Sequence, residues 1–184
     1  MENLELVLPE VFISLSIMFL LILGVFKKNS SKIIHNLSLL ILLITAVITF
    51  NETLSAKQIT LFNESVIIDY LSSFMKIVTL LAAFIVLLIS SNYLRTFKIF
   101  KIEYPILILS SVLGMMIMIS SNDLIVFYMG LELQSLALYV LATFDRDKLK
   151  SSEAGLKYFV LSALSSGLLL YGCSLIYGFT GSTN

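Results

Sequence analysis

Long apolar runs separated by short polar segments extend along the whole chain. A membrane-crossing helix needs about 20 apolar residues, within a range of about 17–25, and this length predicts six spans. They cover residues 6–26, 33–50, 71–94, 104–120, 124–144 and 154–179. We therefore expect an all-α membrane protein in which residues 1–184 form a single membrane domain.

The segment between the second and third spans has a different pattern. Residues 51–70 mix polar and apolar side chains, and their last ten residues, LFNESVIIDY, alternate as strands do. We expect this part to form a small hairpin or strand outside the membrane.

The basic residues give these spans a consistent topology. Nine of the twelve Lys and Arg residues lie in the loops after the first, third and fifth spans. Short loops rich in Lys and Arg stay on the cytoplasmic or matrix face, so we expect both termini on the opposite face. Five or seven spans would break this alternation.

Composition supports a membrane protein and excludes several kinds of site. Hydrophobic residues make up 58% of the chain and charged residues 13%, whereas soluble domains are about half apolar and about a quarter charged. A single cysteine, Cys173, and a single histidine, His35, argue against a disulfide or a metal cluster. Acidic and basic residues balance, so the net charge indicates no nucleic-acid partner. We expect this chain to bind no metal and no cofactor.

A carboxylic acid lies inside the fifth span, in the segment YMGLELQSLALYV. At 1.5 Å per residue, Glu132 is roughly 12 Å from one end of the span and about 18 Å from the other. Ionisable groups at such depth are rare and commonly mark an ion or proton path. Tyr128, Ser135 and Tyr139 share its helix face. We interpret Glu132 as a protonatable relay group with hydroxyl neighbours; the alternative is a structural carboxyl, protonated and hydrogen-bonded across helices.

Three further ionisable residues are candidates for the same path. Lys157 follows Glu153 by four residues, an order that favours an ion pair within a helix, and a role in charge movement is the alternative. Lys76, in the third span, is expected to reach the interface or to pair with Asp69. His35, at the start of the second span, is a candidate for a proton path.

Other polar and small residues are interpreted as structural. Glu10 is expected at the membrane interface, and Asp123 is expected to cap the fifth helix. The small side chains of the sixth span predict a close helix–helix contact rather than chemistry. They are Ser162, Ala163, Ser166 and Gly167.

Several motifs occur in order along the chain: L-x-L-x-x-P-E at the start, D-Y-L-S-S-F-x-K, G-x-E-x-x-S-x-x-x-Y-x-L, S-x-E-A-x-x-K-Y-F, and the run SALSSGLLLYG. Through them the chain resembles the antiporter-like subunits of respiratory complex I. It is most similar to the group called subunit 2, or subunit N in bacteria. The resemblance covers nearly the whole chain and is most specific over residues 122–179.

The resemblance implies proton translocation. In this family the glutamate of the fifth helix, here Glu132, pairs with a lysine of the seventh helix. The lysine at the start of the sixth helix, here Lys157, lies near the same water-filled half-channel. Such subunits carry no redox cofactor. NADH, FMN, iron–sulfur clusters and ubiquinone are used by other subunits of the complex, and the chain would be a non-redox subunit of that NADH:ubiquinone reductase.

The resemblance also implies that this chain is the N-terminal part of an inverted-repeat bundle. Family members continue beyond the sixth helix, with the seventh-helix lysine and a second repeat. We therefore expect either a split subunit, in which a second chain supplies the C-terminal helices, or a fragment. The expected partners are that chain, the other membrane-arm subunits of complex I and the lipid bilayer.

Location and function each leave alternatives open. The abundance of Ile, Leu, Ser, Lys, Asn and Phe suggests AT-rich coding, and the N-terminus lacks the basic residues of a transit peptide. We expect the mitochondrial inner membrane, with both termini facing the intermembrane space; the bacterial plasma membrane, with periplasmic termini, is the alternative. The functional alternatives are a structural membrane-arm subunit without a complete proton channel, and a related cation/proton antiporter or membrane hydrogenase subunit.

Overall fold

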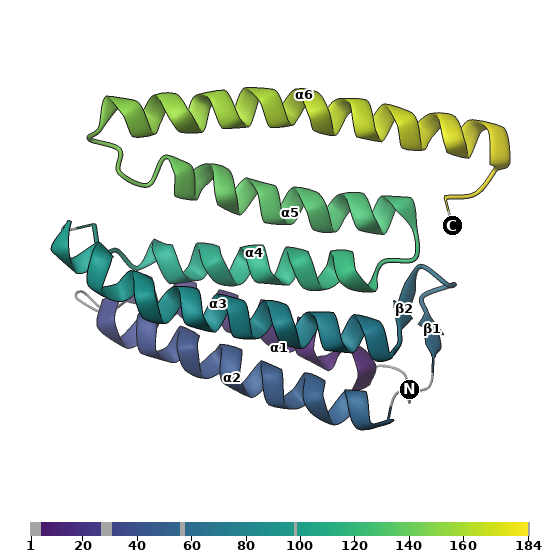
Figure 1. The fold of residues 1–184 in the computed structure, drawn as a ribbon, viewed down its shortest axis with the longest axis horizontal. Helices are drawn as coiled ribbons and strands as arrows, with labels where there is room; N and C mark the ends of the chain where they lie inside the picture. The colour runs from purple at the N-terminus through teal and green to yellow at the C-terminus, as the bar shows by residue number, and fades with distance from the viewer. Residues whose placement is uncertain (1–4, 27–30, 56–57, 98, 184) are drawn as a thin grey trace.

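The computed structural model describes residues 5–26, 31–55, 58–97 and 99–183, and six α-helices account for most of them (Figure 1). A short 3-10 turn, Glu5–Val7, precedes the first helix. The helices are α1 Leu8–Phe26, α2 Ser31–Ser55, α3 Tyr70–Thr96, α4 Glu103–Ser120, α5 Leu124–Ala142 and α6 Leu149–Thr180. Each contains a stretch long and apolar enough to cross a membrane, so the expected all-α membrane fold is confirmed.

Two helices extend beyond the apolar runs that revealed them. α6 begins at Leu149, where the expected span begins at residue 154, and α2 continues to Ser55. The polar residues at these ends still make the backbone hydrogen bonds of a helix. A span predicted from apolar residues alone leaves such polar residues out. The residue before α6, Lys148, has extended backbone geometry and marks the point where the helix starts.

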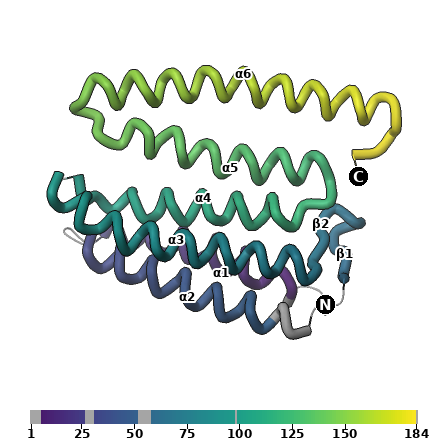
Figure 2. The backbone as a smooth tube through the Cα atoms, viewed as in Figure 1, coloured from purple at the N-terminus to yellow at the C-terminus, as the bar shows by residue number. Residues whose placement is uncertain are grey.

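The expected hairpin is present between α2 and α3. Strand β1, Ile59–Leu61, pairs antiparallel with β2, Val66–Ile68. The hairpin also binds the loop between α4 and α5, because Asn122 donates its backbone N–H to Ser65 O at 2.9 Å and its side-chain amide to Glu64 O at 2.7 Å. Figure 2 shows the hairpin, the start of α1 and the end of α6 at the same end of the bundle.

The hydrophobic core lies among α1, α2, α3 and α4. Its most deeply buried apolar side chains include Ile13, Leu20, Ile34, Leu42, Leu80, Leu87, Leu109 and Met116. α5 packs on α4, and α6 packs on α5 at the edge of the bundle. Most of the α6 surface is exposed and apolar, which is the surface that a helix presents to lipid or to another chain.

Two glycines bring α4 and α5 into direct backbone contact. A Cβ atom added to Gly114 would lie 2.6 Å from Gln134 N and 2.7 Å from Gly130 O. One added to Gly130 would lie 2.8 Å from Met118 N and 2.9 Å from Gly114 O. Because neither position can hold a side chain without displacing backbone, this contact sets the position of α5 and of the residues it carries.

α6 is held against α5 near both of its ends. Near its start, Gly155 packs so closely on Thr143 that an added Cβ would overlap the threonine methyl group. After its last turn, the chain reverses and Thr183 O accepts a hydrogen bond from Leu124 N at 2.9 Å. The Thr183 hydroxyl also donates to Asp123 at 2.5 Å. This bond, with those from the backbone N–H groups that Asp123 caps, holds the pKa of that carboxyl below its ordinary value.

Candidate functional site

Glu132 is hydrogen-bonded across the interface between α5 and α6. The Ser166 hydroxyl donates to Glu132 Oε1, and the hydroxyl groups of Tyr128 and Ser166 are 3.0 Å apart. A serine hydroxyl has one proton to donate. Since Ser166 gives its proton to Glu132, Tyr128 must donate to Ser166. The three side chains therefore form a directed chain from Tyr128 through Ser166 to the carboxylate.

A second hydroxyl pair continues this interface one turn away along α6. The Tyr139 hydroxyl donates to Ser162 Oγ, and the tyrosine ring meets the edges of Tyr158 and Phe159 at centroid distances of 4.9 Å and 5.7 Å. We use the name polar seam for the five residues that meet here. They are Tyr128, Glu132 and Tyr139 of α5 with Ser162 and Ser166 of α6.

The small residues of α6 are predicted to make a close helix contact, and the structure shows such a contact with α5 at Ser162 and Ser166. Both hydroxyls bind side chains of α5, whereas an added Cβ at Gly167 would meet nothing within 4 Å. The spacing of four residues between Ser162 and Ser166 indicates that their two hydroxyl groups lie on one helix face. Sequence alone did not show that this face meets Glu132.

Ser135 is buried but does not bind the Glu132 carboxyl. Its hydroxyl donates to the backbone oxygens of Leu131 at 2.8 Å and Glu132 at 3.1 Å, within its own helix. Serine inside a helix commonly bonds back to the preceding turn. Of the residues expected around Glu132, the structure thus brings Tyr128 to it, through Ser166, and leaves Ser135 with a local bond.

Lys157 lies away from the polar seam. Its ammonium group is 2.5 Å from Glu153 Oε1, and the two side chains are 67% and 55% exposed. Ser166 lies nine residues further along α6, a rise of about 13 Å. The local ion pair that the spacing predicts is therefore present, and such exposed pairs contribute little to stability.

Lys76 forms a buried ion pair that was not expected. Its Nζ lies 2.6 Å from Glu10 Oε1, and the side chains are 1% and 11% exposed. The pair joins α3 to the first turn of α1. Asp69, the expected partner, instead caps α3, accepting the backbone N–H of Ser72 at 2.7 Å. Lys76 therefore does not pair with Asp69, and Glu10, which is expected at the membrane interface, turns toward α3.

This ion pair has hydrogen-bonding capacity that the described residues leave unused. Glu10 Oε2 is buried and has no hydrogen-bond partner among the described residues. The same holds for the hydroxyl group of Ser73, three residues before Lys76 on α3. The Lys76 ammonium group is close to Glu10 but does not meet the geometry of a hydrogen bond. α1 and α3 start at the same end of the bundle, and Glu10 and Lys76 are the third and seventh residues of their helices. The sequence therefore places Glu10 and Lys76 at similar depths in two helices that run in the same direction, although it does not show that the two side chains meet.

His35 is buried in the core formed by α1 to α4. It is 3% exposed, its ring lies 5.6 Å from that of Phe100, and its Nδ1 has no hydrogen-bond partner in the described part of the chain. The helix that carries it, α2, packs chiefly on α1 and α3. The structure therefore does not bring His35 to the polar seam. Over the described residues, no three His, Cys, Asp or Glu side chains are placed to hold a metal ion.

Loss of the Ser166 hydroxyl should weaken the contact between α5 and α6. Ser166→Ala leaves the Glu132 carboxyl without its donor and Tyr128 without its acceptor. We expect a cost of about 1 kcal/mol, as for other hydrogen bonds between membrane helices, measured by unfolding the membrane assembly in a denaturing detergent. Ser165→Ala, at an exposed neighbouring position, is the matched control. Equal effects of the two changes would contradict a specific role for the Ser166 bond.

Six membrane-length helices and a carboxyl on an interhelical polar seam define a polytopic membrane bundle of the antiporter-like fold. A family profile described as "NADH:quinone oxidoreductase/Mrp antiporter, TM" matches residues 121–184. The NADH-quinone oxidoreductase subunit N of Pelagibacter ubique is 71% identical over the whole of this chain, and that of Maricaulis maris is 51% identical over 99% of it. Along its whole length the chain is therefore similar to subunit N of bacterial NADH-quinone oxidoreductases.

Two solved structures have a similar fold. A chain of respiratory complex I from Thermus thermophilus is similar over 95% of this chain, with a TM-score of 0.80 and 27% identity. A chain of an archaeal membrane-bound sulfane sulfur reductase is similar over 96%, with a TM-score of 0.82 and 24% identity, which shows the fold alone. This chain spans 39% and 38% of the two subunit N relatives and 38% of each solved chain. The resemblance found in the sequence is thereby confirmed.

Proposed function

We propose that this chain is part of a proton-translocating membrane-arm subunit of an NADH:quinone oxidoreductase, and that Glu132 is the carboxyl that takes up and releases the proton. The observation that carries this proposal is the directed hydrogen-bond chain from Tyr128 through Ser166 to Glu132. It links an ionisable group inside the membrane to two hydroxyl groups, which can each accept one proton and pass on another. The similarity to subunit N of NADH-quinone oxidoreductases supports the proposal.

The partner that the described residues offer Glu132 is a hydroxyl and not a cation. A cation within about 4–6 Å would favour the charged carboxylate, and its withdrawal would favour the proton-bound form. The family resemblance implies a seventh-helix lysine for this role. We propose that a segment beyond residues 1–184, containing the remaining helices of the subunit, supplies that lysine. The exposed apolar surface of α6 offers an area on which such a segment can pack.

The proposed setting is a bacterial plasma membrane. The named relatives are bacterial, which supports the location kept as the alternative and gives no support to the mitochondrial one. The basic loops would face the cytoplasm and both termini the periplasm. The chain would act without a redox group of its own, driven by electron transfer from NADH to quinone in other subunits of the complex. Lys157 would contribute at the cytoplasmic end, where its exposed pair with Glu153 lies.

Glu132→Gln is the variant that tests this function. The amide oxygen of glutamine can still accept the Ser166 hydrogen bond, so we expect the complex to assemble. The amide cannot bind and release a proton at any pH at which the complex works, so the number of protons transferred per quinone reduced should fall several-fold. The measurement is proton uptake by vesicles containing the purified complex, alongside its NADH:quinone activity.

Glu64→Gln is the matched control, because Glu64 is an exposed carboxylate in the hairpin turn. It should leave proton uptake unchanged. Normal pumping by an assembled Glu132→Gln complex would overturn the proposal. Failure of that complex to assemble would instead support a structural carboxyl.

A further inference from the structure

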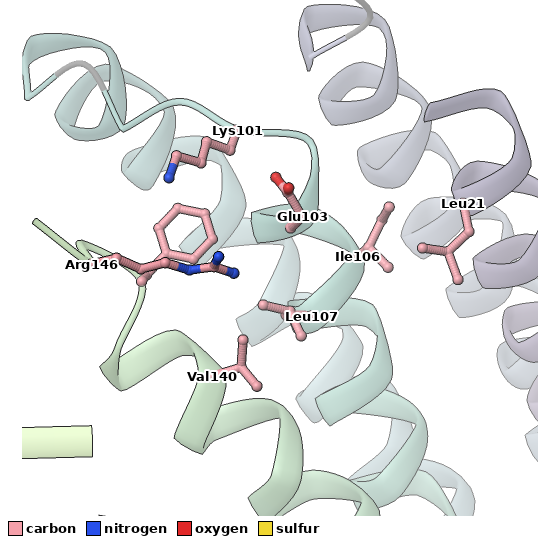
Figure 3. A pocket seen from close by; sticks show the side chains of 8 residues that line it. Leu21, Lys101, Glu103, Ile106, Leu107, Val140 and Arg146 are labelled. Atoms are coloured by element: carbon pink, nitrogen blue, oxygen red, sulfur yellow. The ribbon is translucent and has the colours of Figure 1, made fainter. Parts of the chain in front are cut away.

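A cavity of about 250 Å³ opens at the end of the bundle opposite the hairpin (Figure 3). It lies between α1, the start of α4, and the chain that follows α5. None of the residues that line it belongs to the polar seam. The cavity is therefore a separate feature, placed where the membrane-spanning helices meet the basic loops.

Two cations and one carboxylate border this cavity. Lys101 precedes α4 by two residues, and Arg146 follows the last residue of α5 by four. Neither forms an ion pair within the described part of the chain. Glu103, in the first turn of α4, lies near them in Figure 3. Their formal charges sum to one positive charge, so the rim complements a ligand with one negative charge.

Aromatic contacts place Phe144 and Lys101 together at the rim of the cavity. The Phe144 ring meets the edge of Tyr104 at a centroid distance of 5.6 Å, which fixes the chain after α5 against α4. Lys101 Nζ lies 5.8 Å from the centroid of the Phe144 ring. Arg146 follows Phe144 by two residues and its guanidinium group points into the cavity in Figure 3. Lys101 is thus placed by packing as well as by chain connectivity.

The deeper wall of the cavity is apolar. It is formed by Leu21 of α1, Ile106 and Leu107 of α4, and Val140 of α5. All four lie within membrane-spanning helices, and Leu21 and Val140 are each 45% exposed. A ligand that fits this arrangement has an anionic head at the membrane surface and an apolar chain that enters the membrane.

We propose that this cavity binds a phospholipid with one negative charge, with its phosphate between Lys101 and Arg146. Basic pockets between helices on the cytoplasmic side are suited to anionic lipid head groups, and the loops here carry the basic excess of the chain. The Glu103 carboxylate accepts hydrogen bonds and repels a second acid. The head group that fits is therefore phosphatidylglycerol, whose glycerol hydroxyls can donate to Glu103.

The test uses the native membrane assembly that contains this chain, stripped of lipid and then incubated with defined lipids. Binding of phosphatidylglycerol is measured by native mass spectrometry over a concentration series. One basic residue near the surface contributes about fivefold in affinity for an anionic lipid. We expect the double variant Lys101→Gln/Arg146→Gln to lose about 25-fold in apparent affinity for one bound lipid.

Lys148→Gln is the control variant, since Lys148 lies in the same basic loop but pairs with Asp145 and does not line the cavity. It should retain the affinity of the unchanged assembly. Equal binding of phosphatidylcholine would overturn the proposal, because it would show an apolar groove without charge selection. Competition by millimolar inorganic phosphate would also overturn it, because it would show a site for free anions. An unchanged affinity in the double variant would place the lipid elsewhere.

Discussion

Replacing Lys76 with methionine is expected to destabilise the bundle by about 3–5 kcal/mol, the usual cost of removing one partner from a buried ion pair. Methionine fills a similar volume but leaves the Glu10 carboxylate facing the interior with its charge unpaired. The pair joins α1 to α3 at 2.6 Å, and the lysine is 1% exposed, so water cannot readily replace the lost partner. The measurement is unfolding of the membrane assembly in a denaturing detergent, with its thermal midpoint as a second readout.

A double variant shows whether the charge pair itself is responsible. Glu10→Gln/Lys76→Met removes both charges, and replacing both members of a buried pair is often close to neutral. We therefore expect the double variant to recover most of the stability lost in the single one. Lys32→Met, at an exposed position near the start of α2, should change stability little. A double variant no more stable than Lys76→Met would show that the two groups are not energetically coupled.

Placing a methyl group at Gly130 is expected to have the second large effect. The Cβ of Gly130→Ala would lie 2.8 Å from the backbone nitrogen of Met118, and a backbone atom of a rigid helix cannot turn aside as a side chain can. We expect a loss of about 3 kcal/mol, at the upper end of the cost of overpacking. Because α5 must move away from α4, the geometry of Glu132 should change too, and proton transfer should fall with stability.

Gly167→Ala provides the matched control for this substitution. An added Cβ at Gly167 meets nothing within 4 Å, and alanine favours a helix over glycine by about 1 kcal/mol. This variant should therefore be as stable as the original protein or slightly more stable. Equal destabilisation by the two glycine substitutions would mean that the contact between α4 and α5 is not the cause.

The arrangement of elements follows from local patterns in the sequence. Apolar runs of membrane length predict all six helices, and the alternation after α2 predicts the hairpin. The ends of α6 are harder to predict, because Leu149 begins the helix within a polar stretch. Local backbone hydrogen bonds decide that boundary, and hydrophobicity does not report on them.

Pairings between distant residues could be predicted only in part. Glu132 could be identified as a candidate because an ionisable group deep in a membrane span is rare and commonly marks an ion or proton path. The ion pair of Lys157 could be predicted because its partner lies in the same helix. Glu10 and Ser166, by contrast, gain their roles from residues on other helices. A single sequence does not specify which helix faces are in contact, so neither partner could be assigned before the helices were placed.

Besides the hydrogen bonds of the polar seam, α6 has two supports near its ends, as a beam does. One support is the contact of Gly155 with Thr143, and the other is the hydrogen bonding of Thr183 with Asp123 and Leu124. A beam held in this way bends most near its centre, and α6, Leu149–Thr180, has its centre close to Ser166. A lateral load on the outer face of α6 would therefore act on the hydrogen bonds of the polar seam, including the one between Ser166 and Glu132.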